Sequence, residues 1–317
     1  MANNNGSSVT EFILLGLTEN WELQGIFFVL FLNIYIVTVL GNLVIILLIR
    51  VHSQLHTPMY FFLCHLSFSD TCYSSSVTLN MLVSFLSVKK SISYLGCAAQ
   101  FCAIFTFGTN ECFLLAVMAY DRFTAICHPL LYTIMMSKKI CTLLVVGSYT
   151  GAGINAMVAT SSVFSLSFCG PNVMNHFLCD FPPLLQLSCS DISLAKALNS
   201  FISGVIVTIT IPTVLISYLY ILLAILKIPS TQGRRKAFST CGAHLTAVAL
   251  FYGTTTFVYV LPNSRDTLEQ NKVLSVFYII VIPMLNPFIY SLRNREVKET
   301  LRRTIRQRRI TSGSDFI

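Results

Sequence analysis

Long stretches without charge recur along this chain, and they constrain its fold more than any other feature. They cover residues 23–49, 51–88, 91–120, 140–179, 197–226, 237–264 and 273–292. Two of them hold a single acid each, and the other five hold no charged residue. An α-helix needs about 20 apolar residues to cross the hydrocarbon core of a bilayer. Seven such stretches predict a polytopic membrane protein.

The expected fold class is an all-α membrane protein, a bundle of seven transmembrane helices followed by a short amphipathic eighth helix. Only 11% of the residues are charged, whereas a soluble domain has about 25%. The apolar stretches lack the strict alternation of strands in a membrane barrel. We expect an N-terminal tail at 1–22, the helical domain at 23–293 and a C-terminal amphipathic helix and tail at 294–317.

The distribution of lysine and arginine predicts which side each end occupies. With seven spans, 16 of the 21 basic residues fall on the side opposite the N-terminus and five on the N-terminal side. Cytoplasmic loops carry the excess of Lys and Arg. We therefore expect an extracellular N-terminus, a cytoplasmic C-terminus and location in the plasma membrane. The net charge of +8 then faces an acidic partner or anionic membrane lipid, and nucleic acid is not an expected partner.

The two termini have different expected roles. The first 22 residues are polar without a basic residue, so no cleaved signal peptide is expected. Asn5 opens a glycosylation sequon, which is usable only on an extracellular tail. Near the other end, Val297, Leu301 and Ile305 recur every four residues among Lys and Arg. This spacing favours an amphipathic helix on the inner leaflet, with a disordered basic tail as the alternative.

Four cysteines fall on the predicted extracellular side, where disulfides persist. Cys97 begins the third span, and Cys169, Cys179 and Cys189 follow ten residues apart in the long loop before the fifth. One loop cysteine paired with Cys97 would tie the loop over the bundle. Four cysteines allow three connectivities, so the spacing alone leaves the pairing open, and free thiols remain an alternative.

Asp70 and Glu111 are the two acids well inside predicted spans. Acids inside a membrane are costly and usually face a partner in the bundle. The pair suggests a bound cation, with sodium favoured, or a shared proton. The alternative is a network of hydrogen bonds with Asn42, Ser67 and Asn286 and no ion. No other cofactor is expected.

The Asp121-Arg122 pair closes the third span and is the candidate switch. Arg122 can pair with Asp121 in one state and turn to Tyr218 or Tyr290 in another, as a two-state element requires. A plain interfacial anchor is the alternative. In the seventh span, Pro287 after Asn286 removes a backbone hydrogen bond, which permits either a moving bend or a static kink. No nucleophile with a convincing base and no H-E-x-x-H, G-x-S-x-G or phosphate loop occurs, so an enzyme is not expected.

Several long motifs resemble one family, and they occur in the right order. They are Gly41-Asn42, Leu55-His56-Thr57-Pro58-Met59-Tyr60-Phe61-Phe62-Leu63, Leu66-Ser67-Phe68-Ser69-Asp70, Met118-Ala119-Tyr120-Asp121-Arg122-Phe123-Thr124-Ala125-Ile126-Cys127-His128-Pro129-Leu130-Leu131-Tyr132, Ser217-Tyr218, Lys236-Ala237-Phe238-Ser239-Thr240-Cys241 and Pro283-Met284-Leu285-Asn286-Pro287-Phe288-Ile289-Tyr290. The chain resembles an odorant (olfactory) receptor of the rhodopsin-like G-protein-coupled receptor family over nearly its whole length. Phe123 in place of Tyr and Leu131 in place of a frequent Arg are small departures.

The resemblance implies a function and a set of site residues. It implies the disulfides Cys97–Cys179 and Cys169–Cys189, and coupling to a stimulatory, olfactory-type G protein that raises cyclic AMP. It assigns Asp121, Arg122, Tyr218, Asn286, Pro287 and Tyr290 to coupling. The positions that it assigns to the ligand pocket are Ile104, Phe105, Gly108, Thr109, Ile202, Ser203, Ile206, Tyr252, Thr255, Thr256, Tyr259 and Ile279.

These pocket residues are apolar with a few hydroxyls, which suits a small, weakly polar volatile odorant. Ile104 stands where amine receptors place an acid, and no Lys or Arg belongs to the set, so amines and carboxylates are disfavoured ligands. The alternatives are a seven-span receptor for another small molecule and an ion-coupled transporter that uses Asp70 and Glu111. Transporters usually show internal repeats, and none is seen here.

Overall fold

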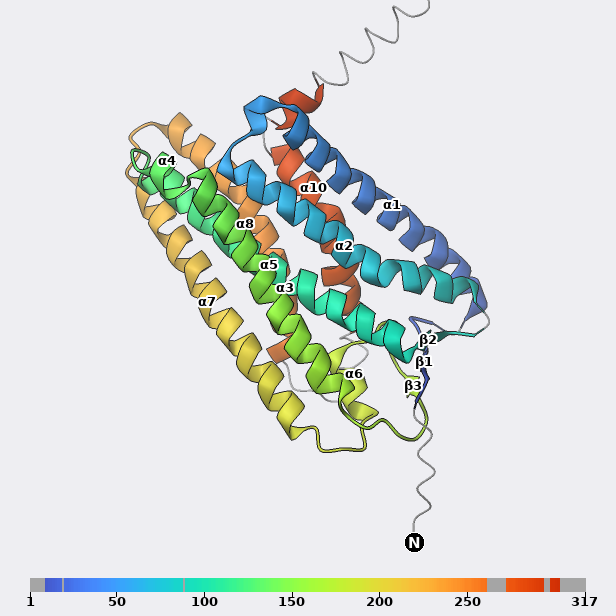
Figure 1. The fold of residues 1–317 in the computed structure, drawn as a ribbon. Coiled ribbons are helices and arrows are strands. Elements are labelled where there is room, and N and C mark those ends of the chain that lie inside the picture. The colour runs from blue at the N-terminus through green and yellow to red at the C-terminus, as the bar shows by residue number, and fades with distance from the viewer. Residues whose placement is uncertain (1–8, 19, 88, 261–271, 294–296, 303–317) are drawn as a thin grey trace, which may run out of the picture.

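A computed structural model describes residues 9–18, 20–87, 89–260, 272–293 and 297–302, which form a helical bundle with a small sheet at one end (Figure 1). The long helices are α1 (Trp21–Val51), α2 (Pro58–Leu86), α3 (Tyr94–Cys127), α5 (Lys138–Phe164), α7 (Ser193–Leu226) and α8 (Thr231–Val260). The shorter elements are the 3₁₀ turn Ser53–Leu55, α4 (Tyr132–Met135), α6 (Phe181–Gln186), the π-helical turn Phe277–Val281 and α10 (Ile282–Arg293). The strands are β1 (Glu11–Leu14), β2 (Ser91–Ser93) and β3 (Val173–Met174).

Polar residues mark where the long helices begin. The Asn20 side chain accepts a hydrogen bond from the Glu22 backbone N–H at 2.9 Å, and Ser93 accepts one from Gly96 at 3.0 Å. Each satisfies a backbone donor that the first turn leaves free. Pro58 occupies the first turn of α2, where its missing N–H costs nothing. The apolar runs therefore become helices whose ends lie at polar residues.

Within the described residues, five helices are long and apolar enough to cross a membrane. They are Trp21–Val51, Tyr94–Cys127, Lys138–Phe164, Ser193–Leu226 and the helical stretch Lys272–Tyr290. The helices α2 and α8 are of similar length, 29 and 30 residues, but less apolar. The predicted all-α membrane fold is thus confirmed at this level, while the number of spans stays a prediction.

The helix α3 occupies the middle of the bundle and packs against α2, α5, α7 and α8. On one side α1, α2 and α10 lie together, and Gly41 of α1 permits a close approach to α10. A Cβ atom added at Gly41 would lie 3.1 Å from the Pro287 Cβ and 3.2 Å from its Cγ. The proline ring therefore fills the space above this glycine, and Pro287 belongs to a packed interface between the two helices.

Replacing Gly41 by valine is expected to destabilise the protein by about 1–3 kcal/mol, the usual cost of forcing extra atoms into a packed core. Gly25→Val is the matched control, because nothing lies within 4 Å of a Cβ at that position of the same helix. Both variants replace glycine by valine within the same helix, so the change in intrinsic helix propensity is the same in both. The melting temperature of detergent-solubilised protein measures the difference, and equal values for the two variants would contradict the packing described here.

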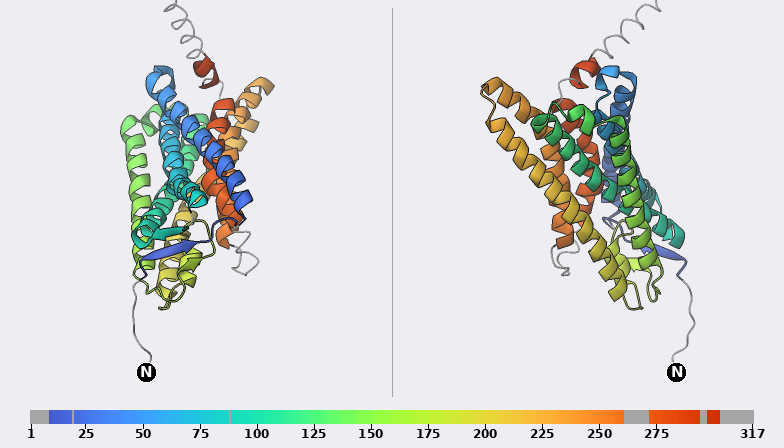
Figure 2. Two further views of the ribbon diagram at one scale, coloured as in Figure 1. Left: turned by 90° about the vertical axis from the view of Figure 1, so that its right-hand side faces the viewer. Right: turned by 60° about the vertical axis from the view of Figure 1, so that its left-hand side comes forward.

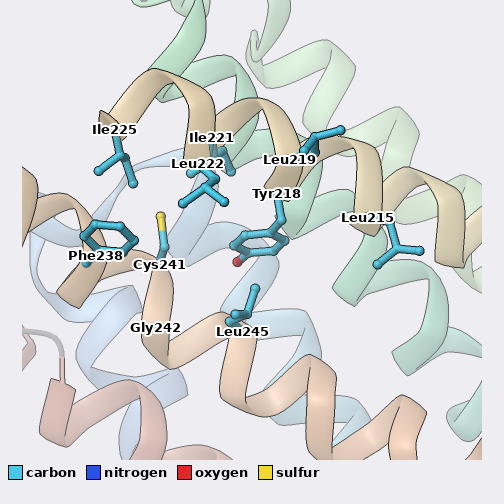
Figure 3. A pocket seen from close by; sticks show the side chains of 10 residues that line it. All are labelled: Leu215, Tyr218, Leu219, Ile221, Leu222, Ile225, Phe238, Cys241, Gly242 and Leu245. Carbon is cyan, nitrogen blue, oxygen red and sulfur yellow. The ribbon is translucent and has the colours of Figure 1, made fainter. Parts of the chain in front are cut away.

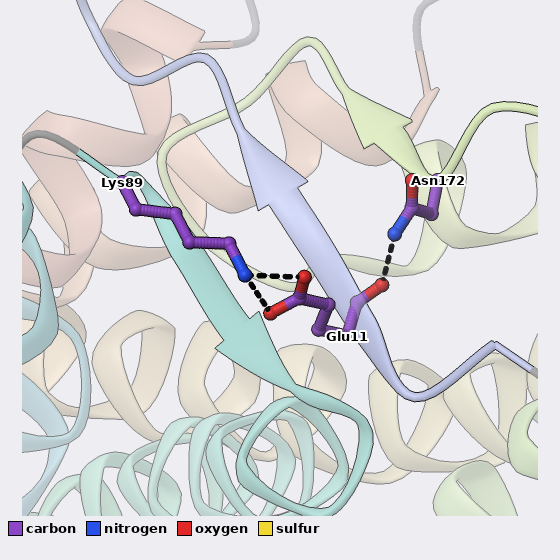
Figure 4. Close-up of polar contacts among 3 residues, drawn as sticks. All are labelled: Glu11, Lys89 and Asn172. Atoms are coloured by element: carbon purple, nitrogen blue, oxygen red, sulfur yellow. Dashed lines mark hydrogen bonds and ion pairs between the residues drawn. The ribbon is translucent and has the colours of Figure 1, made fainter.

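The N-terminal segment forms the centre of a three-stranded sheet, which we call the sheet end of the bundle (Figure 2). The strand β1 runs antiparallel to β2, with Phe12 opposite Ile92, and parallel to β3, with Leu14 opposite Met174. Lys89 contacts both carboxylate oxygens of Glu11, at 2.6 and 2.8 Å, and the Asn172 amide donates to the Glu11 carbonyl (Figure 4). Within residues 1–22, which the sequence predicts to be an extracellular tail, residues 11–14 thus form a strand.

The strand β1 is fixed mainly by its buried side chains. Phe12 is fully buried and lies against the rings of Tyr94 and Phe168. The Lys89 ammonium holds the pKa of the Glu11 carboxyl below its usual range. Because both partners of this ion pair are exposed, it adds little to stability. Buried and half-buried residues alternate along β1, as expected for a strand with one face packed against the bundle.

The opposite end of the bundle, which we call the α4 end, carries the last described helical turn at 297–302. Val297 is buried in the core and Leu301 packs against it. These two apolar residues thus pack on the bundle over the described turn, and the rest of the predicted amphipathic helix lies outside the described residues. Asn5 lies outside them as well.

Candidate ligand site and switch region

The helix α3 carries both groups of residues that the sequence singled out. Ile104, Phe105, Gly108 and Thr109 lie in its half nearer the sheet end, and Arg122 lies near the α4 end. A helix of 34 residues is about 51 Å long at 1.5 Å per residue. One rigid element thus joins the predicted pocket to the predicted switch.

Part of the predicted ligand set comes together around α3. Ile104 and Ile279 are buried in one apolar cluster, and Phe105 packs against it. The Tyr252 hydroxyl donates to the Cys112 carbonyl at 2.9 Å, which ties α8 to α3. A Cβ at Gly108 would lie 3.4 Å from the Tyr73 hydroxyl. These residues of α3, α8 and the π-helical turn therefore share one mostly apolar region.

Other predicted pocket residues are engaged in packing. Thr109 accepts a hydrogen bond from Asn155 of α5 at 2.8 Å, and the Thr255 hydroxyl donates to the Phe251 carbonyl of its own helix at 2.8 Å. On α7, Ile202 and Ile206 are half-buried and Ser203 is exposed. The side chains of Thr256 and Tyr259 lie outside the described residues. The hydroxyls of Thr109 and Thr255 thus already have protein partners.

The Arg122 guanidinium is buried at the α4 end, with 6% of the residue exposed. It donates to the Met59 sulfur at 3.0 Å, and its Nε is buried without a hydrogen-bond partner in the described part of the chain. Asp121 instead accepts a hydrogen bond from the Tyr132 hydroxyl at 2.9 Å. Among the described residues no ion pair joins Asp121 to Arg122, so this conformation is not the state in which the two residues are expected to pair.

The two tyrosines proposed to receive Arg122 differ in their contacts. The Tyr218 hydroxyl and His244 Nδ1 lie 2.6 Å apart and link α7 to α8. The Tyr290 hydroxyl is buried, and no partner for it occurs among the described residues. A hydroxyl without a partner in the interior costs free energy, so an arrangement in which Tyr290 meets a donor or acceptor would relieve that cost. The exchange of Arg122 between partners stays a prediction.

The acids predicted to pair inside the bundle do lie together. The Asp70 and Glu111 carboxyl groups interact, and the Asn286 amide donates to both oxygens of Asp70 at 3.1 and 3.0 Å. Asn42 instead donates to the Thr38 and Pro283 carbonyls. Four buried oxygens in this region lack a hydrogen-bond donor in the described chain: Asn42 Oδ1, Asn110 Oδ1, Glu111 Oε1 and Asn286 Oδ1. Unsatisfied oxygens of this kind are the ligands that hard cations prefer.

The helix before Pro287 departs from regular geometry at a place that the sequence did not indicate. The backbone forms a π-helical turn at Phe277–Val281, ahead of Pro283, whereas Pro287 lies inside the regular helix α10. The bend expected at Pro287 is therefore preceded by a separate irregular turn. Such turns are rare and frequently lie at functional sites, and this one holds Ile279 of the predicted pocket.

Two disulfides fasten the long loop over the sheet end. Cys97 pairs with Cys179 and Cys169 pairs with Cys189, with Cα–Cα distances of 5.6 and 5.9 Å. The resemblance implied this pairing. Cys97 and Cys179 are fully buried, whereas Cys169 and Cys189 are exposed. The first bridge therefore anchors the loop to α3, and the second closes the loop on itself.

The acid beside the first bridge is expected to make stability depend on pH. Burial raises the pKa of the Asp180 carboxyl to about 6. The folded state then binds a proton more tightly than the unfolded state, so stability is highest below the unfolded pKa and falls as pH rises through about 6. This shift corresponds to about 3 kcal/mol.

Asp180→Asn is expected to flatten this dependence, since the amide oxygen can still accept the hydrogen bond that Asp180 takes from the Phe181 N–H. Asp191→Asn is the control with the opposite sign, because hydrogen bonds from Ser193 hold the pKa of Asp191 below its usual range. Melting temperatures between pH 4 and pH 7 measure the effect. A wild-type curve that rises from pH 4 to pH 6 would contradict it.

Three contacts were missed by sequence reasoning. Met59 and Tyr132 contact the switch pair, and Asn155 contacts Thr109. Met59 and Tyr132 both belong to motifs that carried the resemblance. The motifs marked these two residues but did not indicate which side chains they contact. Asn155 is the one amide side chain in the helix α5, and a polar residue in such a position usually faces the bundle.

Comparison with known proteins identifies the family. A family model described as olfactory receptor matches residues 31–308. Olfactory receptor 5P58 of Mus musculus is 59% identical over 313 residues, covering 99% of this chain and 97% of the relative. Olfactory receptor 5P60 of Mus musculus is 60% identical over 315 residues, covering 99% and 98%.

These matches also settle the class of protein. Olfactory receptors are signalling receptors in the membrane, so the predictions that the chain is not an enzyme and is a multi-pass membrane protein are confirmed. With the family model covering most of the chain and relatives this similar over its whole length, the chain belongs to the olfactory receptor family.

Proposed function

We propose that the chain is an odorant receptor with seven membrane-spanning helices, an extracellular tail at 1–22 and a cytoplasmic helix and tail at 294–317. The five candidate spans, together with α2 and α8, supply the seven helices. The disulfide-tied loop at the sheet end suits the oxidising exterior. Arg50, Arg122, Lys138 and Arg234 belong to the α4 end, which the excess of basic charge assigns to the cytoplasm.

The ligand is a small, weakly polar volatile held among α3, α7, α8 and the π-helical turn. The buried Ile104 and Ile279 and the neighbouring Phe105 support an apolar site. Two hydroxyls of the set already join helices: Tyr252 joins α8 to α3, and Thr109 joins α3 to α5. Apolar walls with a few fixed polar groups are typical of small-molecule sites. The other predicted positions of the set complete the proposed pocket.

The response is activation of a stimulatory, olfactory-type G protein, which raises cyclic AMP. The single observation that carries this proposal is that α3 bears the pocket residues at one end and the buried Arg122 at the other. A ligand that packs better against one arrangement of α3, α7 and α8 shifts the equilibrium between arrangements by its difference in affinity. At the α4 end, that shift would change the surroundings of Arg122, Tyr218 and Tyr290.

Sodium is the proposed ion of the polar interior. Asp70 and Glu111 would hold it, together with the donor-free oxygens of Asn110 and Asn286. An ion there would neutralise the repulsion between the two carboxylates. The melting temperature of the purified protein is expected to rise when sodium chloride replaces choline chloride at equal ionic strength, and Glu111→Gln is expected to abolish that rise. An equal rise in the variant would contradict the site.

Screening a library of volatiles by cyclic AMP in transfected cells tests the proposed function. For any agonist found, Ile104→Phe is expected to reduce potency at least about tenfold, because one extra group in an apolar pocket shifts affinity by about 1–3 kcal/mol. Leu95→Phe is the matched control on the same helix, where the side chain is 77% exposed. Equal potency for the two variants would place the ligand elsewhere.

A further inference from the structure

A groove of about 320 Å³ lies between α7 and α8 in the half of the bundle nearer the α4 end (Figure 3). Its walls are apolar side chains from both helices. Six of the lining residues are Leu215, Leu222, Ile225, Phe238, Gly242 and Leu245. The groove separates two helices that belong to the proposed activation region, and none of its lining residues belongs to the predicted ligand set.

The groove is open on the outer face of the bundle, and its exposed lining is apolar. Leu215, Leu222 and Leu245 are 64%, 43% and 45% exposed. Tyr218, the one hydroxyl in the lining, is already bonded to His244 at 2.6 Å. From Leu215 to Ile225 the groove runs along ten residues of helix, about 15 Å. That is half of the roughly 30 Å hydrocarbon core of a bilayer, the depth of one leaflet.

The end of the groove nearest the turn between the two helices carries positive charge. Lys227 follows α7, and Arg234 and Arg235 lie in the first turns of α8. Arg234 and Arg235 precede the lining residue Phe238 by four and three residues, which places them on the same side of the helix. The Arg234 Nε is buried and has no hydrogen-bond partner within the described residues.

No acid from the surrounding sequence neutralises this charge. Between Asp191 and Asp266 the chain contains no Asp or Glu. Among the described residues, the only ion pair joins Lys89 to Glu11 at the other end of the bundle. A basic residue near a membrane surface attracts anionic lipid by about 1 kcal/mol, so this cluster of cations favours a phosphate group.

We propose that this groove is a binding site for one anionic phospholipid. One acyl chain would lie in the groove between α7 and α8, and Arg234 and Arg235 would bind the headgroup phosphate. Of the proposed function, the lipid site requires only that the helices span a membrane. It adds a lipid partner at the boundary of α7 and α8, on the outer face of the region where Tyr218 and His244 meet.

The single tryptophan of the chain, Trp21, allows a direct test. In a Trp21→Phe background, Leu222→Trp places a fluorophore on the rim of the groove. Leu223→Trp is the matched control, because Leu223 is 47% exposed on the same helix and does not line the groove. Each protein is reconstituted in vesicles that contain dibrominated phosphatidylserine or dibrominated phosphatidylcholine, and quenching of tryptophan fluorescence gives the relative affinity of the two lipids.

At Leu222→Trp we expect phosphatidylserine to be preferred at least about fivefold, the ratio that corresponds to about 1 kcal/mol from a basic side chain. At Leu223→Trp we expect no preference. Arg234→Ala with Arg235→Ala is expected to abolish the preference at the groove. Lys138→Ala with Lys139→Ala, which removes the same charge at the start of α5, is expected to leave it unchanged. Leu219→Trp, a second lining position, repeats the measurement should Leu222→Trp not fold.

An equal preference at the groove and control positions would mean general attraction of anionic lipid to the protein and would overturn the site. Loss of the preference in the Lys138 and Lys139 variant would overturn it as well. The measurement needs neither odorant nor G protein, and both leaflets of the vesicle contain the anionic lipid. A negative result in the quenching experiment would therefore not contradict the proposed receptor function or orientation. Conversely, a negative result for receptor function or orientation would not contradict the lipid site.

Discussion

Removing the bridge between Cys97 and Cys179 is expected to abolish display of the receptor at the cell surface. The bridge closes a separation of 82 residues, for which the chain-entropy relation gives about 4–5 kcal/mol. Natural domains are stable by only about 5–15 kcal/mol, so this loss is a large share of the total. Both sulfurs lie in the buried cluster that also holds Phe12 and Met174, so the packing of β1 and β3 is expected to loosen with it.

The second bridge provides the matched comparison. Cys169 and Cys189 are separated by 20 residues, for which the same relation gives about 3 kcal/mol, and both are exposed. We expect the Cys169→Ala with Cys189→Ala protein to keep more surface display than the Cys97→Ala with Cys179→Ala protein. Staining of an N-terminal tag on intact cells measures both. Equal display of the two double variants would contradict the anchoring role assigned to the first bridge.

Replacing Arg122 by alanine is expected to reduce agonist-stimulated cyclic AMP to the level of unstimulated cells while surface display is retained. The buried guanidinium donates to the Met59 sulfur, and its Nε has no hydrogen-bond partner among the described residues. Sulfur is a weak acceptor, so the group is held loosely and can change partners at low cost. Its removal takes away the charge that the proposed switch moves.

Two further variants separate loss of switching from loss of folding. Arg122→Lys keeps the charge but lacks the planar fork of donors, so an intermediate response is expected. Lys138→Ala removes an exposed basic residue at the same end and is expected to signal normally. Full signalling by Arg122→Ala at normal surface display would show that this residue is an interfacial anchor and would contradict its role as a switch.

The apolar runs predicted most of the helices because membrane-spanning helices need continuous hydrocarbon surface. They predicted the ends less well. The charge-free run at 237–264 begins six residues after the observed start of α8 at Thr231. The polar residues Thr231 to Lys236 extend the helix beyond the apolar part, and helical backbone bonds do not require apolar side chains.

The strand β1 and the contacts of Arg122 could not be derived from spacing. A four-residue strand holds only through its partners β2 and β3, which lie about 80 and 160 residues further along the chain. The contact between Met59 and Arg122 likewise joins α2 to α3 through side chains that periodicity does not address. The pairing of Cys97 with Cys179 followed from family resemblance alone, because four cysteines permit three connectivities.

Nucleotide exchange on purified stimulatory G protein tests whether an agonist makes this receptor activate the G protein. The receptor is reconstituted in vesicles, and the rate of GDP release from the heterotrimer is followed with and without an agonist from the volatile screen. We expect faster GDP release with agonist and loss of that effect in Arg122→Ala. We also expect no agonist-dependent flux of ions or solute. Agonist binding that leaves the exchange rate unchanged, or that moves solute across vesicles without G protein, would contradict the proposed function.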